Sequence, residues 1–190
     1  IQNTQSPTPA WGIDRVDQRE KVGLPGSTSA YGYRSAGAGA TIYIGDTGIF
    51  PHTDFAGRLS TSGFSSINDG NGTVDCNGHG THVAGTVGSA SYGVAKKVTI
   101  VPLHALAPAN ACSSGGSTSN VIAAINWAIN DNPAGKHAVI NMSLGPSTPA
   151  LRDTAMDAAI TNAITAFQAA LRIDPAHAGA YRALTETYIV

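Results

Sequence analysis

Residues 40–48 read ATIYIGDTG. The short apolar run at 40–44 is followed by Gly45 and then by an acidic residue, Asp46. The run is rich in β-branched residues and is bounded by glycines, which predicts a buried β-strand. In parallel α/β sheets, functional groups gather at the carboxyl ends of the strands. Asp46 is therefore well placed for chemistry, and the plainer interpretation is that it only caps a turn.

Further strand and helix signals follow along the chain. Residues 98–103 and 138–144 predict two more strands, and a short strand is expected near 59–63 within a polar loop. The apolar side chains of 120–130 recur at a spacing of three and four, which predicts a helix. Residues 80–87 fit either a strand or a helix of small residues. This alternation of strands and helices predicts a parallel α/β sheet.

The two ends of the chain differ in residue pattern from its central part. Residues 1–37 are predicted to be irregular and turn-rich. Residues 151–173 contain no Gly or Pro and predict one long helix, and a second helical stretch is predicted at 176–190. The predicted fold class is therefore α/β, with a parallel β-sheet flanked by helices and a C-terminal helical hairpin.

Composition narrows the class of protein. The chain has 190 residues, with 11 Lys and Arg against 12 Asp and Glu and a net charge of −1. The length fits one domain, and the balanced charge excludes the basic surface expected of a nucleic-acid binder. No run of about 18 apolar residues occurs, so no membrane span is predicted. The first residues lack signal-peptide features, so we expect either a cytosolic chain or a mature secreted form.

A second motif follows the first along the chain. Residues 75–85 read DCNGHGTHVAG and place His79 among glycines and other small residues. A histidine needs a carboxylate on one ring nitrogen to fix its tautomer before it acts as a general base. The plainer interpretation is a loop histidine without a chemical role. The two cysteines, Cys76 and Cys112, could form one disulfide or remain free thiols, and their number leaves both open.

Together these motifs closely resemble those of the subtilase family of serine endopeptidases, in the branch of proteinase K and aqualysin. Five segments carry the resemblance: DTG at 46–48, NGHGTHVAG at 77–85, NMSLG at 141–145, WGIDRVDQR at 11–19 and YGVAK at 92–96. The resemblance covers about residues 8–166 and implies a partial subtilisin-like peptidase domain at 1–166. The motif around His79 is highly specific.

The resemblance implies roles for individual residues. Asp46 would orient His79, and His79 would act as the general base of peptide-bond hydrolysis. Two backbone segments would bind an extended peptide or protein substrate: Ser114, Gly115 and Gly116, and Ser143, Leu144 and Gly145. His82 matches a structural position of the family, with a His-x-x-His metal pair as the weaker alternative. No catalytic cofactor is implied.

The resemblance also implies a disulfide and a structural metal. It pairs Cys76 with Cys112, which implies an extracellular protein whose leader is absent from this chain. Calcium is expected at two sets of residues: Asp14, Asp17 and Gln18, and Asp69, Asn71 and Asp75. The first set matches a calcium-binding segment of some relatives, and the second is an oxygen-rich loop of the kind that hard cations prefer. A solvated surface loop explains the second set nearly as well.

The sequence departs from the family pattern in its second half. It contains no Gly-Thr-Ser-x-Ala-x-Pro segment for the nucleophile and no Ala-Ala-Gly-Asn-type segment for the oxyanion hole. We therefore expect the N-terminal part of a serine endopeptidase, which carries the Asp and the His without the Ser. The alternative is a non-catalytic peptide- or protein-binding module derived from the same fold.

Smaller departures concern the tail and two strands. Residues 167–190 resemble part of a tetratricopeptide repeat, with an ordinary two-helix tail as the alternative. A protein partner is expected at this tail or at an exposed sheet edge along 138–142. Gly45 weakens the strand before the aspartate, and the run VPLHAL at 101–106 is an unusual core strand.

Overall fold

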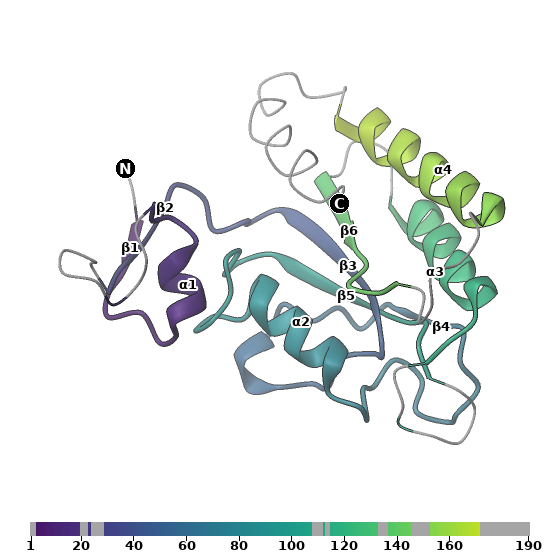
Figure 1. Cartoon of the computed structure of the whole chain (residues 1–190), viewed down its shortest axis with the longest axis horizontal. Coiled ribbons are helices and arrows are strands. Elements are labelled where there is room, and N and C mark those ends of the chain that lie inside the picture. Colours follow the sequence, from purple (N-terminus) through teal and green to yellow (C-terminus); the bar gives the residue numbers. More distant parts are fainter. Residues whose placement is uncertain are drawn as a thin grey trace.

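The structure is a computed structural model that describes most of the chain (Figure 1). The described residues are 3–19, 23, 29–107, 112, 115–132, 137–145 and 153–171. In chain order the elements are β1 (Asn3–Gln5), α1 (Trp11–Arg15), β2 (Tyr31–Tyr33), β3 (Ala40–Asp46), the 3-10 helix η1 (Thr53–Phe55), β4 (Phe64–Ser65), α2 (His79–Gly88), β5 (Thr99–His104), α3 (Thr118–Asp131), β6 (His137–Asn141) and α4 (Thr154–Leu171). Within these ranges the helix predicted at 120–130 is found as α3.

A parallel sheet forms the centre of the molecule. Its strand order is β4-β5-β3-β6, so β3 lies between β5 and β6. Tyr43 of β3 is opposite Val101 of β5 and Ile140 of β6 in the register. The strands predicted at 98–103 and 138–144 are therefore present, and the α/β fold class is confirmed. Within the described residues β6 is an edge strand, where a protein partner stays a prediction.

One face of the sheet is covered by α2. Side chains along a strand point alternately to the two faces. Ile42 and Ile44 of β3 and Ile100 of β5 point to the face where Ala84 of α2 packs, and all four are buried. Residues 80–87, which fit a strand or a helix, are therefore a helix whose small side chains allow close packing on the sheet.

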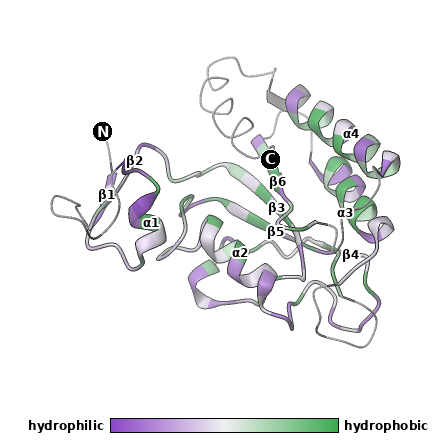
Figure 2. Ribbon diagram, viewed as in Figure 1, coloured by the Kyte–Doolittle hydropathy of each residue, from purple (hydrophilic) through white to green (hydrophobic). Residues whose placement is uncertain are grey.

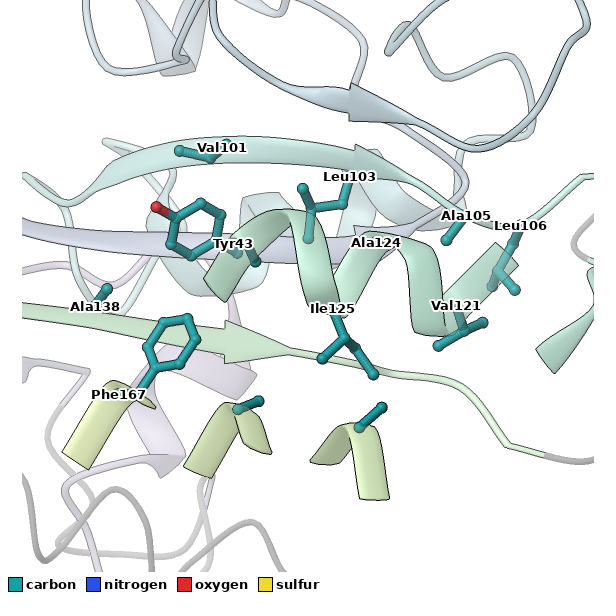
Figure 3. Packing of buried hydrophobic residues seen from close by; sticks show 13 residues of the cluster. Tyr43, Val101, Leu103, Ala105, Leu106, Val121, Ala124, Ile125, Ala138 and Phe167 are labelled. Atoms are coloured by element: carbon teal, nitrogen blue, oxygen red, sulfur yellow. The ribbon is translucent and has the colours of Figure 1, made fainter. Parts of the chain in front are cut away.

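The opposite face is covered by α3 and α4. Tyr43 and Leu103 point to this face and pack against both helices (Figure 3). The ring of Tyr43 meets the ring of Phe167 edge-on, with 5.9 Å between centroids. The Tyr43 hydroxyl donates to Asp131 at 2.9 Å. Along α3 and α4, apolar and polar residues alternate (Figure 2), as expected of helices with one buried face.

The unusual strand β5 contains Pro102, which has no N–H to donate. The amide of Ile100 donates to the carbonyl of Arg58, and the carbonyl of His104 accepts from the amide of Ser66. The N–H and C=O groups of successive residues point alternately to the two sides of a strand. Those of Ile100, Pro102 and His104 therefore point toward β4. The missing donor falls outside the ladder between β3 and β5, which stays continuous.

Two sequence predictions were wrong. The short strand expected near 59–63 lies at Phe64–Ser65, and Leu59 forms only an isolated bridge. Residues 1–37 are not simply irregular, because they contain the antiparallel pair β1 and β2 and the helix α1. Each of these elements has at most five residues, too few for periodicity to reveal them.

The long helix predicted at 151–173 is found as α4. It runs without a break across the predicted domain boundary at 166/167, and Phe167 is buried in the core beneath it. The second helix predicted at 176–190, and most of the tetratricopeptide-like tail, lie outside the described residues. No helix of the described ranges is long and apolar enough to cross a membrane.

We expect Phe167→Ala to lower the free energy of unfolding by about 3 kcal/mol, because it leaves a cavity beside Tyr43. The matched control is Ile164→Ala on the same helix, where the side chain is 44% exposed and the expected change is below about 0.5 kcal/mol. Urea denaturation followed by circular dichroism measures both. Equal effects of the two substitutions would show that α4 does not dock on the sheet.

Candidate active site

Asp46 and His79 meet at the carboxyl edge of the sheet. Asp46 is the last residue of β3, and His79 is the first residue of α2. The Nδ1 atom of His79 lies 2.7 Å from Oδ1 of Asp46, a hydrogen-bond distance between residues 33 apart in the sequence. The two motifs singled out in the sequence therefore converge on one contact.

The carboxylate of Asp46 is held in place by the end of its own strand. Its side chain is fully buried, and the backbone amide of Thr47 donates to Oδ1 at 2.7 Å. No donor within the described part of the chain reaches Oδ2. Both hydrogen bonds therefore meet at Oδ1, which fixes the oxygen that faces the imidazole.

The position of His79 suits a general base. An ionised carboxylate only accepts hydrogen bonds, so Nδ1 carries the hydrogen and Nε2 keeps its lone pair. The side chain of His79 is 47% exposed, so Nε2 is accessible to a reacting group. This tautomer can accept a proton from a hydroxyl nucleophile. His82, three residues later on α2, is also exposed.

Two glycines explain why the histidine motif is rich in small residues. A Cβ atom at Gly80 would lie 2.2 Å from the carbonyl oxygen of Gly48 and 3.1 Å from Cβ of Asp46. Any side chain at this position would push α2 away from β3 and separate His79 from Asp46. Gly78 precedes the helix with φ of 102°, a left-handed conformation that favours glycine.

A disulfide attaches the segment just before α2 to residue 112. Cys76 and Cys112 are bonded, with 5.3 Å between their Cα atoms. The side-chain amide of Asn77 also donates to the carbonyl of Cys112 at 2.9 Å. Two consecutive residues shortly before His79, Cys76 and Asn77, are thus bonded to residue 112. The disulfide implied by the family resemblance is present.

Comparison with known proteins decides the family. The profile of the subtilase family matches residues 37–175, well over half of the chain. This chain belongs to the subtilase family. The match begins three residues before β3 and extends past the end of α4, so it includes the sheet and both residues of the Asp46–His79 contact in this subtilase.

Relatives of this subtilase are named as proteinases. It is 47% identical over 163 residues to an extracellular serine proteinase of a Thermus species, covering 85% of this chain and 36% of the relative. It is 42% identical over 161 residues to alkaline serine exoprotease A of Vibrio alginolyticus, covering 84% and 28%. A crystal structure of a cold-adapted subtilisin-like serine proteinase matches with a TM-score of 0.68 and 39% identity, covering 85% of this chain and 54% of that one. The chain spans about a third of the length of these curated relatives.

The segments predicted to bind substrate follow the two neighbours of β3. Residues 115–116 come after β5, and residues 143–145 come after β6. Because β3 lies between these strands, its carboxyl end lies between theirs. Gly116 has no room for a side chain, since a Cβ atom there would lie 2.9 Å from Cδ2 of Leu106. Ser114 lies outside the described residues.

The carboxylates of the predicted calcium sets accept hydrogen bonds from the protein itself. Asp14 accepts from the side chain of Gln18, and Asp17 accepts from a backbone amide. Asp69 accepts from both the backbone and the side chain of Asn71. Where the chain is described, no group of three or more His, Cys, Asp or Glu could hold a metal ion. The calcium sites gain no support from this geometry and stay a prediction.

Asp75, the last member of the second calcium set, is part of a buried hydrogen-bond network. It accepts from the hydroxyl groups of Thr47 at 2.9 Å and Thr81 at 2.5 Å, and from three backbone amides. Burial raises the pKa of Asp75, but the hydrogen bonds from Thr81 and Gly78 outweigh it, so the pKa is below its usual value. Sequence reasoning missed both threonines, because nothing in their spacing shows that their hydroxyl groups converge.

Replacing both cysteines with serine should lower the free energy of unfolding by about 4 kcal/mol. The disulfide closes a loop between residues 36 apart, and its removal gives that loop back its freedom in the unfolded chain. Urea denaturation with and without a reducing agent measures the effect. The reduced wild-type chain should match the Cys76→Ser, Cys112→Ser double variant, and an oxidised wild type no more stable than the variant would contradict the prediction.

Asp75 should make stability depend on pH in the acid range. Its pKa is lowered on folding, so its contribution is present above the unfolded value of about 3.9 and is lost as the pH falls through the folded value. We expect the difference in free energy of unfolding between the wild type and Asp75→Asn to shrink between about pH 6 and pH 2. Urea titrations at several pH values measure it, and a constant difference would count against the ionised network.

Proposed function

We propose that this chain carries the aspartate and the histidine of a subtilisin-like serine endopeptidase, which hydrolyses peptide bonds. The observation that carries the proposal is the 2.7 Å contact between Nδ1 of His79 and Oδ1 of Asp46. Asp46 fixes the tautomer of the imidazole and stabilises its protonated form. His79 takes the proton of the nucleophile and later returns it to the leaving amine.

The serine nucleophile would come from outside these residues. The 190 residues contain no Gly-Thr-Ser-x-Ala-x-Pro segment, and they match about a third of the length of the curated relatives. A catalytic triad works as a unit, so an aspartate and a histidine alone retain little of its rate enhancement. The chain by itself is therefore expected to be inactive.

The proposed substrate is an extended peptide or an unfolded stretch of protein. Residues 115–116 and 143–145 follow the strands on either side of β3, so a peptide held between them would cross the catalytic pair. Backbone groups at such segments would bind the main chain of the substrate as an added strand. Small residues suit that role, because they allow close approach.

We also propose that the protein is secreted. The disulfide between Cys76 and Cys112 is the kind of bond that persists in oxidising compartments. The relative from Thermus is named an extracellular proteinase. Secretion also fits an enzyme that acts on protein substrates outside the cell.

The oriented imidazole favours an endopeptidase over a non-catalytic binding module, because a module that only binds peptides needs no such group. An active-site serine phosphonate separates the two. The chain alone should give no covalent adduct by intact mass. A chimera, in which residues 1–166 replace the matching part of the Thermus proteinase, should be labelled at one serine and should hydrolyse peptides.

The control is His79→Ala in the same chimera, which should lower kcat by about a million-fold, as removal of a catalytic histidine does in a working triad. Circular dichroism shows that both chimeras are folded. A folded chimera that binds peptide without hydrolysing it would contradict the proposal and favour the binding module. An adduct on the chain alone would show that its own sequence contains the nucleophile.

A further inference from the structure

The start of α2 is held by side chains from outside the helix. The residue before the helix, Gly78, has no side chain to cap it. The amide of His79 donates to Asn77, that of Gly80 donates to Thr47, and that of Thr81 donates to Asp75. A side chain at the capping position commonly satisfies one such amide, as Ser117 does for Asn120 of α3. The start of the helix that carries His79 is thus held both by the segment just before it and by Thr47, which is 33 residues away from Gly80 in the sequence.

Asp75 is the centre of these contacts. Its side chain is buried, and both of its oxygens are used: Oδ1 by Thr47, Asn77 and Gly78, and Oδ2 by the amide and the hydroxyl of Thr81. A negative charge at this end of a helix is also favoured by the helix dipole. One carboxylate therefore organises the residues on both sides of His79.

Thr47 connects this carboxylate to the other catalytic residue. It is buried and directly follows Asp46. Its hydroxyl donates to Asp75 at 2.9 Å and accepts from the amide of Gly80 at 2.9 Å. Thr47, the residue after Asp46, is thus bonded both to Asp75 and to Gly80, the residue after His79.

The segment that carries Asp75 is itself fixed to the sheet. The amide of Ile49 donates to the carbonyl of Thr73 at 2.9 Å. The ring nitrogen Nδ1 of the buried His104 on β5 donates to the carbonyl of Gly72 at 2.7 Å. These contacts hold Thr73 and Gly72, two and three residues before Asp75, and so limit the movement of the segment that carries the carboxylate.

We propose that Asp75, acting through Thr47, is a positioning residue that sets the distance and the angle at which His79 meets Asp46. The inference rests on the proposed function, because it gives Asp75 a role only if that contact is catalytic. A displacement of about 1 Å in a catalytic group costs about a hundredfold in rate. Five hydrogen bonds on one buried carboxylate are a direct means of preventing it.

The test is proton NMR of the full 190-residue chain. The hydrogen on Nδ1 of His79, bonded to Asp46, gives a resonance well downfield of the amides, and His79→Ala assigns it by its loss. Asp75→Asn and Thr47→Val should broaden or abolish this resonance, because the imidazole gains freedom and its hydrogen exchanges faster with water. Thr47→Ser keeps the hydroxyl and should restore the resonance.

Tyr43→Phe is the matched control for a general loss of stability. It removes a buried hydrogen bond to Asp131 on the other face of the sheet, so the resonance should persist. If Asp75→Asn does not fold, Thr47→Val carries the test, since it removes one hydroxyl and keeps the volume. Circular dichroism confirms which variants are folded.

The outcomes separate the two proposals. A folded wild type without the resonance would overturn both the catalytic contact and the positioning role. A wild-type resonance that is unchanged in folded Thr47→Val and Asp75→Asn would overturn only the positioning role. Loss of the resonance in Tyr43→Phe as well would assign the effect to stability and likewise overturn it. Loss in Thr47→Val with recovery in Thr47→Ser supports the proposal.

Discussion

The contact between Asp46 and His79 depends on how closely the start of α2 approaches the end of β3. A helix and a strand normally keep the distance that their side chains require, yet here the approach leaves no room for a Cβ atom at Gly80. That closeness brings His79 within 2.7 Å of Asp46. It also brings Thr47 and Asp75 within hydrogen-bond distance of the first backbone amides of α2. The close approach and the hydrogen bonds that stabilise it therefore involve the same few residues.

The position of β3 in the sheet determines which elements surround the Asp46–His79 contact. Because the strand lies between β5 and β6 and all three are parallel, their carboxyl ends meet at one edge. Alternate side chains of β3 are buried under α2 on one face and under α3 and α4 on the other. A strand packed on both faces and paired on both sides is a rigid support, which a general base and its carboxylate require.

Secondary structure was predicted correctly from the sequence where the residue pattern of an element carries one strong signal. Strands rich in β-branched residues were found close to where they were predicted, because strands covered by helices on both faces, such as β3 and β5, have a continuous apolar run. Prediction failed at several of the shortest elements, such as Phe64–Ser65, since these depend on their neighbours rather than on their own pattern. Residues 80–87 remained open because small side chains suit both a strand and a helix, and the packing of Ala84 against the sheet decided between them.

By itself, the sequence determined the fold class and the family, and through the family resemblance it indicated the disulfide and the pairing of Asp46 with His79, because each leaves a local pattern of side-chain types. The tertiary structure decided how they are held. The sequence places Asp75 in a polar, oxygen-rich loop, and in the fold its oxygens accept hydrogen bonds from the protein's own hydroxyl and amide groups. The reason is that hydrogen bonds between residues distant in the chain form only after the sheet has set their separation, and no spacing along the chain records that distance.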